Sequence, residues 1–134
     1  MSLTPRSASG MSCSPTDSTR FTLMAARGEI WVVDLDPTRG REQRGTRPAL
    51  IVSADQINNG PAQLAVIVPL TTTERRVPLH VRIEPPDGGV REVSFAMCEM
   101  VRSVSTSRLV RRWGRLDEQT MRVVEDRLRI LLDV

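Results

Sequence analysis

The sequence predicts a mostly β fold of the α+β class: a small barrel of short strands with one helix at the C-terminus. The first observation behind this prediction is a series of six or seven short apolar runs separated by turn signals, which is typical of a small sandwich or barrel. The second is a change of hydrophobic period after Gly114, where a helical spacing replaces the strand pattern. The length of 134 residues and the apolar content of 40% suit one domain with one core.

The N-terminal segment differs in composition from the rest of the chain. Residues 1–26 hold six serines, four threonines and a single acidic residue, Asp17, without any sustained hydrophobic period. Such a segment cannot bury enough apolar surface to offset its ordering entropy, so we expect a disordered tail. We expect residues 27–134 to form the folded domain. Met24 is a candidate first residue, in which case the tail is not part of the native protein.

The strands follow from apolar patterning and from the residues that interrupt it. The first run is β-branched and aromatic and ends at Asp36-Pro37, because proline cannot continue a strand ladder. The third run lacks alternation, which indicates burial on both faces, whereas the fourth alternates as a half-exposed strand does. The turn between the fourth and fifth runs is Pro85–Gly89. The six expected strands are residues 29–35, 49–53, 64–69, 79–84, 93–101 and 109–113.

The C-terminal residues predict one helix. Asp117 is a suitable N-cap, and charged side chains fall largely on the face opposite the apolar one. The expected core face is Met121, Val124, Leu128 and Leu131.

Composition also excludes several kinds of site. Two cysteines, Cys13 and Cys98, and one histidine, His80, provide no zinc-ligand spacing. His80 alternates with apolar residues, so a surface or hydrogen-bonded histidine is favoured over a catalytic one, and Cys98 lies in an apolar run typical of a buried thiol. The longest apolar runs are too short to cross a bilayer and no secretion leader is recognisable, so we expect a cytoplasmic protein.

Positive charge gathers in the connection formed by residues 36–48. Between Arg39 and Arg47 there are four arginines and one glutamate, a local excess of three positive charges, while the remaining 15 basic and 15 acidic residues balance. Guanidinium groups bind phosphate bidentately, and a long strand connection is often functional, so a binding role is favoured over a mobile hairpin tip. Arg47 stands out because it directly precedes Pro48 and is held extended at the mouth of a strand. The alternative role of Arg47 is a salt bridge at the barrel rim.

A second polar stretch leaves the buried third strand. After Leu70 come three threonines, Thr71 to Thr73, and after Glu74 come Arg75-Arg76. Threonine hydroxyls at a strand end can bind phosphate oxygens, with arginines adding charge, although three threonines are also ordinary in a β-rich loop.

The stretches that carry a family resemblance are Arg27 to Ser53, the strand end Pro69-Leu70-Thr71, and Gly114-Arg115-Leu116. Through them the chain closely resembles the MazF/PemK toxin family over about 108 residues. The resemblance implies an SH3-like barrel of the MazF/CcdB type that pairs as a homodimer. It also implies a ribosome-independent and metal-independent endoribonuclease, which needs no cofactor, cuts single-stranded RNA within a short sequence and is neutralised by a cognate MazE-like antitoxin. In this reaction the 2′-hydroxyl attacks the adjacent phosphate and leaves a 2′,3′-cyclic phosphate and a 5′-hydroxyl.

The resemblance also assigns roles to individual residues. Arg47 would contact the scissile phosphate and assist proton transfer, Thr71 would hold a non-bridging oxygen, and Glu42 could act as general base. The residues expected to bind RNA are Arg41, Gln43, Arg44, Thr72, Arg75 and Arg76. One departure concerns specificity: where many relatives carry a glutamine after the acidic residue, this chain has Met100 after Glu99.

Two non-enzymatic alternatives remain at this point. The same barrel occurs in toxins that bind DNA gyrase, as in the CcdB relatives, and an inactive decoy that only binds antitoxin is also conceivable. The arginine loop together with Arg47 and Thr71 favours the enzyme, because a gyrase binder does not need these residues.

Overall fold

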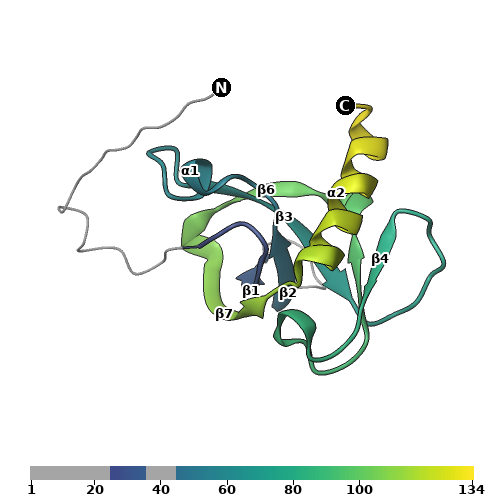
Figure 1. Ribbon diagram of the computed structural model, residues 1–134. Coiled ribbons are helices and arrows are strands. Elements are labelled where there is room, and N and C mark those ends of the chain that lie inside the picture. The colour runs from purple at the N-terminus through teal and green to yellow at the C-terminus, as the bar shows by residue number, and fades with distance from the viewer. Residues whose placement is uncertain (1–24, 36–44) are drawn as a thin grey trace.

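A computed structural model describes residues 25–35 and 45–134 of the chain, so the expected tail and most of the arginine-rich connection lie outside the described residues. The described part contains the expected run of short strands followed by a long C-terminal helix (Figure 1). The strands are β1 (Glu29–Asp34), β2 (Thr46–Ile51), β3 (Leu64–Thr71), β4 (His80–Ile83), β5 (Ser94–Met97), β6 (Arg102–Ser105) and β7 (Leu109–Arg115). The helices are α1 (Asp55–Asn58) and α2 (Glu118–Leu132), with single turns η2 (Asp87–Gly89), η3 (Cys98–Met100) and η4 (Thr106–Arg108).

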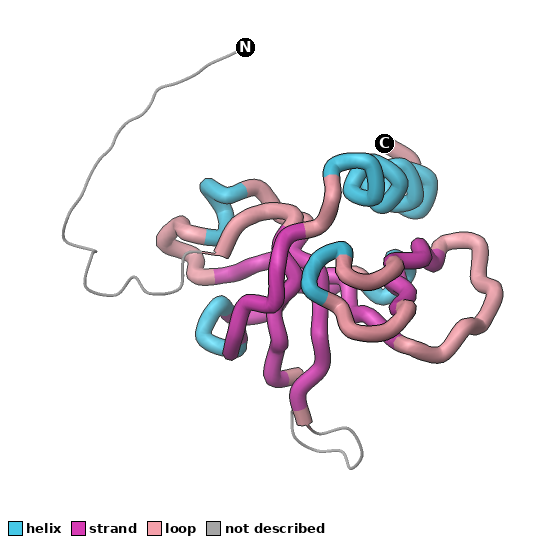
Figure 2. The backbone as a smooth tube through the Cα atoms, turned by 60° about the horizontal axis from the view of Figure 1, so that its bottom comes forward, coloured by secondary structure: helices cyan, strands magenta, loops and turns pink. Residues whose placement is uncertain are grey.

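All strand pairs are antiparallel, in the order β4-β5-β3-β2-β1-β7, with β6 paired to β3. Because β6 joins β3 while β7 joins β1, and η4 links β6 to β7, the five strands β1, β2, β3, β6 and β7 curl around a shared interior. Figure 2 shows the strands crossing one another steeply around this interior, with α2 on its outside. The arrangement confirms the predicted barrel with a C-terminal helix.

Two apolar clusters lie on opposite faces of the central strands. One cluster lies beneath α2 and includes Leu50, Val68 and Val124, while the other fills the barrel and includes Ile51 and Ile67. Neighbouring residues of β2 and β3 therefore point into different clusters, because successive side chains of a strand face opposite ways. This double burial explains why the two strands appear in the sequence as continuous apolar runs.

The expected core face of α2 is confirmed in part. Val124 is fully buried, and Met121 and Leu128 pack against the same cluster, but Leu131 is only partly buried and lies outside it. Asp117 occupies the N-cap position, yet its side chain makes no capping hydrogen bond. Instead, the carboxylate of Asp87 in η2, distant in the chain, accepts a hydrogen bond from the backbone N–H of Asp117.

Neither helix in the described part of the chain has the length and apolar character needed to cross a membrane.

The expected single strand over residues 93–101 is wrong. β5 ends at Met97, the turn η3 follows, and β6 begins only at Arg102. The physical reason is that β5 pairs with the C-terminal end of β3 whereas β6 pairs with its N-terminal half, so the chain must cross from one place to the other. The short helix α1 was not predicted, because a single turn leaves no hydrophobic period to detect.

Candidate active site

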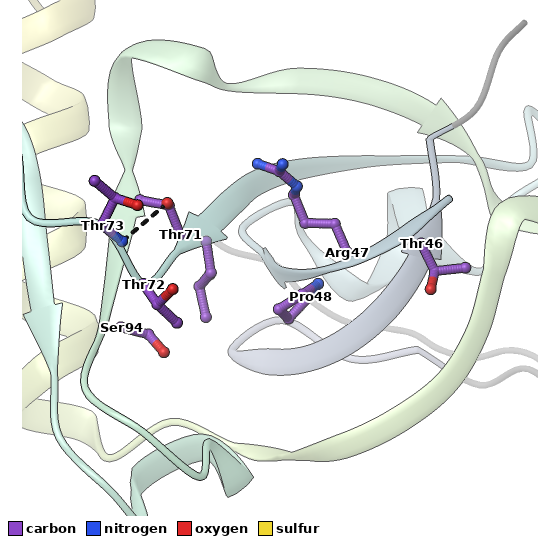
Figure 3. A pocket seen from close by; sticks show the side chains of 8 residues that line it. Thr46, Arg47, Pro48, Thr71, Thr72, Thr73 and Ser94 are labelled. Atoms are coloured by element: carbon purple, nitrogen blue, oxygen red, sulfur yellow. Dashed lines mark hydrogen bonds between the residues drawn. The ribbon is translucent and has the colours of Figure 1, made fainter. Parts of the chain in front are cut away.

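The register of β2 and β3 brings Arg47 and Thr71 together. Ala49 pairs with Pro69 and Ile51 with Ile67, and this register, continued to the ends of the two strands, sets Arg47 opposite Thr71. Side chains directly opposite each other in an antiparallel pair point to the same face and lie close together. Figure 3 shows the Arg47 side chain extending toward Thr71. The two residues singled out in separate stretches of the sequence therefore form one site.

A cavity of about 350 Å³ opens at this end of the sheet (Figure 3). Its volume is at the small end of the range for ligand sites. The wall combines one guanidinium with several hydroxyl groups and two apolar side chains. The lining residues are Thr46, Arg47, Pro48, Leu70, Thr71, Thr72, Thr73 and Ser94.

The backbone of Arg47 is fixed within a strand, and its guanidinium has no ion-pair partner among the described residues. It lies in β2, where it pairs with Val33 of β1, and it is partly buried. Gly45 precedes the strand with φ of +123°, a conformation that favours glycine. Among residues 25–35 and 45–134, none forms an ion pair with Arg47, so the alternative of a rim salt bridge finds no partner there. The guanidinium can offer its donors to a ligand.

Thr71 is held so that its hydroxyl can donate. Its Oγ1 accepts a hydrogen bond of 3.2 Å from the backbone N–H of Thr73, and its Cα pairs with Phe95 in β5. Because this bond uses a lone pair, the hydroxyl hydrogen remains available for an acceptor such as a phosphate oxygen. Arg47 and Thr71 together thus present hydrogen-bond donors on one face of the sheet.

The other predicted site residues are placed unequally. Thr72 lines the cavity and is exposed. Arg75 and Arg76 are exposed on the connection from β3 to β4 and do not line the cavity, and Arg76 has a left-handed φ of +55°. The remaining predicted residues lie outside the described part of the chain: Arg41, Glu42, Gln43 and Arg44.

Ser94 was missed by the sequence analysis although it lines the cavity. It begins β5, has an exposed fraction of 5%, and donates a hydrogen bond of 2.9 Å to the backbone oxygen of Glu92. Ser94 carries no motif of its own and is distant in sequence from Arg47 and Thr71. Only the pairing of β5 with β3 brings it to the site.

His80 and Cys98 lie outside the cavity. The His80 side chain is 4% exposed, with Nε2 at 2.7 Å from Oε2 of Glu99, while its buried Nδ1 has no partner among the described residues. The expectation of a hydrogen-bonded histidine is therefore met at Nε2 and not at Nδ1. Cys98 is buried as expected; burial, together with the nearby charge of Glu99, raises the pKa of its thiol to about 11. A thiol with so high a pKa stays protonated and unreactive at neutral pH.

Comparisons with known proteins identify the family and agree with the fold. Residues 26–132 match the family described as PemK-like, MazF-like toxin of type II toxin-antitoxin system. The endoribonuclease MazF9 of Mycobacterium tuberculosis is 36% identical over 116 residues, which cover 83% of this chain and 98% of that protein. The endoribonuclease PemK of Escherichia coli is 38% identical over 108 residues, covering 79% of this chain and 80% of that protein. The solved MazE-MazF structure (Form-II) of Deinococcus radiodurans gives a TM-score of 0.71 at 26% identity, covering 83% of this chain and 97% of that chain.

Proposed function

The chain belongs to the PemK-like, MazF-like toxins of type II toxin-antitoxin systems, and we propose that it is an endoribonuclease that cleaves single-stranded RNA within a short sequence. The observation that carries the proposal lies where β2 begins and β3 ends. There the Arg47 guanidinium, which forms no ion pair with any described residue, and the Thr71 hydroxyl, which is free to donate, line one cavity. Two relatives named as endoribonucleases, MazF9 and PemK, support the same activity.

The proposed reaction uses the 2′-hydroxyl of the RNA as nucleophile. It attacks the adjacent phosphorus, the bond to the 5′-oxygen of the next nucleotide breaks, and the products are a 2′,3′-cyclic phosphate and a 5′-hydroxyl. The five-coordinate transition state carries extra negative charge on its equatorial oxygens. Donors aimed in advance at these oxygens stabilise that charge better than water does, because they need no reorganisation. Arg47 and Thr71 supply such donors from one sheet face.

Proton transfer requires a further group, and we assign it to Glu42. A carboxylate is ionised at neutral pH and can take the proton of the attacking hydroxyl, whereas a guanidinium keeps its proton at that pH. The protonated carboxyl can then return this proton to the departing 5′-oxygen, which leaves as a hydroxyl. We therefore assign to Arg47 mainly the stabilisation of charge. The mechanism needs no metal ion, because donors and a base on the chain itself supply both charge stabilisation and proton transfer.

Binding of the RNA strand extends beyond the cavity in this proposal. Arg75 and Arg76 are exposed and can contact phosphates of a bound strand, and Thr72 adds a hydroxyl at the cavity wall. In the same role we place Arg41, Gln43 and Arg44. A cationic surface of this kind also suits an acidic, flexible segment of a MazE-like antitoxin, which would compete with RNA. We further propose that the protein acts as a homodimer in the cytoplasm.

The decisive experiment incubates the purified full-length chain with 5′-labelled single-stranded RNA in EDTA. We expect upstream fragments that end in a 2′,3′-cyclic phosphate. Sequencing from the 5′-hydroxyl ends of the downstream fragments identifies the cut site. Arg47→Ala should abolish cleavage while circular dichroism shows an intact fold. Arg122→Ala is the matched control, because Arg122 is an exposed arginine of α2 remote in sequence from the cavity. Intact RNA with the wild-type protein would instead favour a gyrase-binding toxin or an inactive decoy, and full activity of Arg47→Ala would refute the assigned site.

A further inference from the structure

We propose that Ser94 forms an acceptor subsite that receives a hydrogen-bond donor of the nucleotide bound at the cavity, either a ribose 2′-hydroxyl or an N–H group of a base. This inference rests on the proposed function, since it assigns a contact within the same RNA site. It adds a residue that selects which nucleotide fits beside the scissile phosphate.

The polarity of the Ser94 hydroxyl is fixed by its backbone partner. Its hydrogen is directed at the carbonyl oxygen of Glu92 at 2.9 Å, and the side chain is nearly fully buried at the cavity wall. A hydroxyl has one hydrogen and two lone pairs, so once the hydrogen is committed the oxygen can only accept. None of the described residues donates a hydrogen bond to this oxygen.

Ser94 and Thr71 therefore offer opposite polarity to a ligand. Thr71 already accepts from the N–H of Thr73 and can donate, which suits a phosphate oxygen. A phosphate oxygen has no hydrogen to give, so it cannot bind the committed oxygen of Ser94 and would be repelled by its lone pairs. The group that Ser94 accepts from must carry its own N–H or O–H.

Strand alternation places this acceptor beside apolar surface. Phe95 pairs with Thr71, whereas Ala96 pairs with Leu70, so Ser94 shares the sheet face of Leu70 and lies opposite in direction to Thr71. Leu70 and Pro48 also line the cavity and give it apolar surface. A nucleotide can thus set its phosphate against Arg47 and Thr71 and pass its sugar or base over the strand ends to the Ser94 side.

The position of Ser94 is rigid enough for such selection. β5 lies between β3 and β4, and Ser94 pairs with Ile83 of β4. A buried polar atom that lacks its partner costs more free energy than the bond itself contributes, so a site of this kind rejects ligands without the donor.

The test combines Ser94→Ala with substrate analogues. Cleavage of an RNA of established cut site is compared with analogues that lack one donor each. The 2′-deoxy or 2′-fluoro analogues modify the nucleotides near the scissile bond but not the one that supplies the attacking 2′-hydroxyl, and the base analogues lack the exocyclic amino or ring N–H. We expect Ser94→Ala to lower kcat/KM about tenfold on the parent RNA, the scale of one neutral hydrogen bond. On the one analogue that lacks the bound donor, the variant and the wild type should cleave at equal rates. Equal rates of the variant and the wild type on a 2′-modified analogue identify the ribose as the donor, and equal rates on a base analogue identify the base.

Two controls keep the test decisive. Ser103→Ala removes an exposed hydroxyl from β6 and should leave every rate unchanged. Ser94→Cys replaces the hydroxyl with a somewhat larger thiol that accepts only weakly, so it should follow Ser94→Ala. An equal loss on all substrates would mean that Ser94 acts only on the structure and would overturn the proposal, as would no loss at all. Wild-type protein that leaves every RNA intact would instead refute the proposed function itself.

Discussion

At the scale of single residues, backbone groups decide what each hydroxyl of the cavity can bind. Thr71 accepts from the N–H of Thr73, while Ser94 donates to the carbonyl of Glu92. The same chemical group thus serves as a donor in one place and as an acceptor in the other. Arg47 adds charge that no described residue neutralises. These three residues give the cavity a donor side and an acceptor side.

Removing the Thr71 hydroxyl should slow the chemical step. We expect Thr71→Ala to lower kcat by roughly 10²–10³, the usual loss when one donor to a developing oxyanion is deleted. Thr71→Ser keeps the hydroxyl and its bond from Thr73, so it should retain most of the rate. Single-turnover cleavage at saturating enzyme measures this step directly. Equal rates for Thr71→Ala and wild type would remove Thr71 from the reaction.

At the scale of elements, α2 is anchored at its N-terminus by a distant carboxylate. Asp87 of η2 accepts from the backbone N–H of Asp117 at 2.7 Å and from Oγ1 of Thr120 at 2.9 Å. This contact satisfies one backbone donor at the helix N-terminus, the N–H of Asp117, and ties the side chain of Thr120 to the same carboxylate. It also fixes α2 to the turn between β4 and β5, over the apolar cluster that contains Val124.

Substituting Asp87 and Asp117 one at a time should show which of the two carboxylates stabilises the N-terminus of α2. Asp87→Ala should lower the free energy of unfolding by about 1 kcal/mol, the usual cost of a lost cap. Asp117→Ala should cost about half as much or less, because only its charge near the helix N-terminus is lost. Urea unfolding followed by circular dichroism measures both. A larger cost for Asp117→Ala than for Asp87→Ala would contradict the assigned roles.

At the scale of the whole molecule, one buried carboxylate, that of Glu29, joins the start of the domain to strands β1 and β7. Glu29 accepts from the N–H of Ala26, from Nε1 of Trp31 and from Nε of Arg112 on β7. Burial raises the pKa of Glu29, but the hydrogen bonds from these three groups and the charge of Arg112 outweigh burial and hold the pKa below its ordinary value of 4.5. The ionised form is thus the one that the fold stabilises.

This shift predicts a specific loss of stability in acid. A carboxylate whose pKa is lower in the folded state stabilises the fold above its unfolded pKa and loses that effect as pH falls through the folded pKa. At pH 7, the free energy of unfolding of Glu29→Gln should therefore be about 1–3 kcal/mol lower than that of wild type, the range for hydrogen bonds to a charged group. The difference should shrink as pH falls below the ordinary value of 4.5.

Denaturant unfolding at several pH values tests this prediction. Glu84→Gln is the matched control, because Glu84 forms an exposed pair with Arg82 and should contribute little at any pH. A constant difference between Glu29→Gln and wild type across the acid range would show that ionisation of Glu29 is not what stabilises the fold.

The sequence predicted most of the fold because its signals are local. Continuous apolar runs marked the strands buried on both faces, and helical spacing marked the core face of α2. The break after Met97 was missed, because the residues that follow are as apolar as a strand and only the divergent pairing of β5 and β6 requires a turn. Asp117 was the only cap that local spacing could indicate, since Asp87 is distant in the chain.

For the site, the sequence by itself determined the chemistry: which guanidinium precedes a proline at a strand entrance, which threonines end a buried strand, and which family the whole pattern resembles. Only the tertiary structure decided which of these groups meet. The antiparallel register of β2 and β3 unites Arg47 with Thr71, and the pairing of β5 adds Ser94. The physical reason is that side-chain chemistry is a property of each residue, whereas proximity depends on hydrogen bonds between strands distant in the chain.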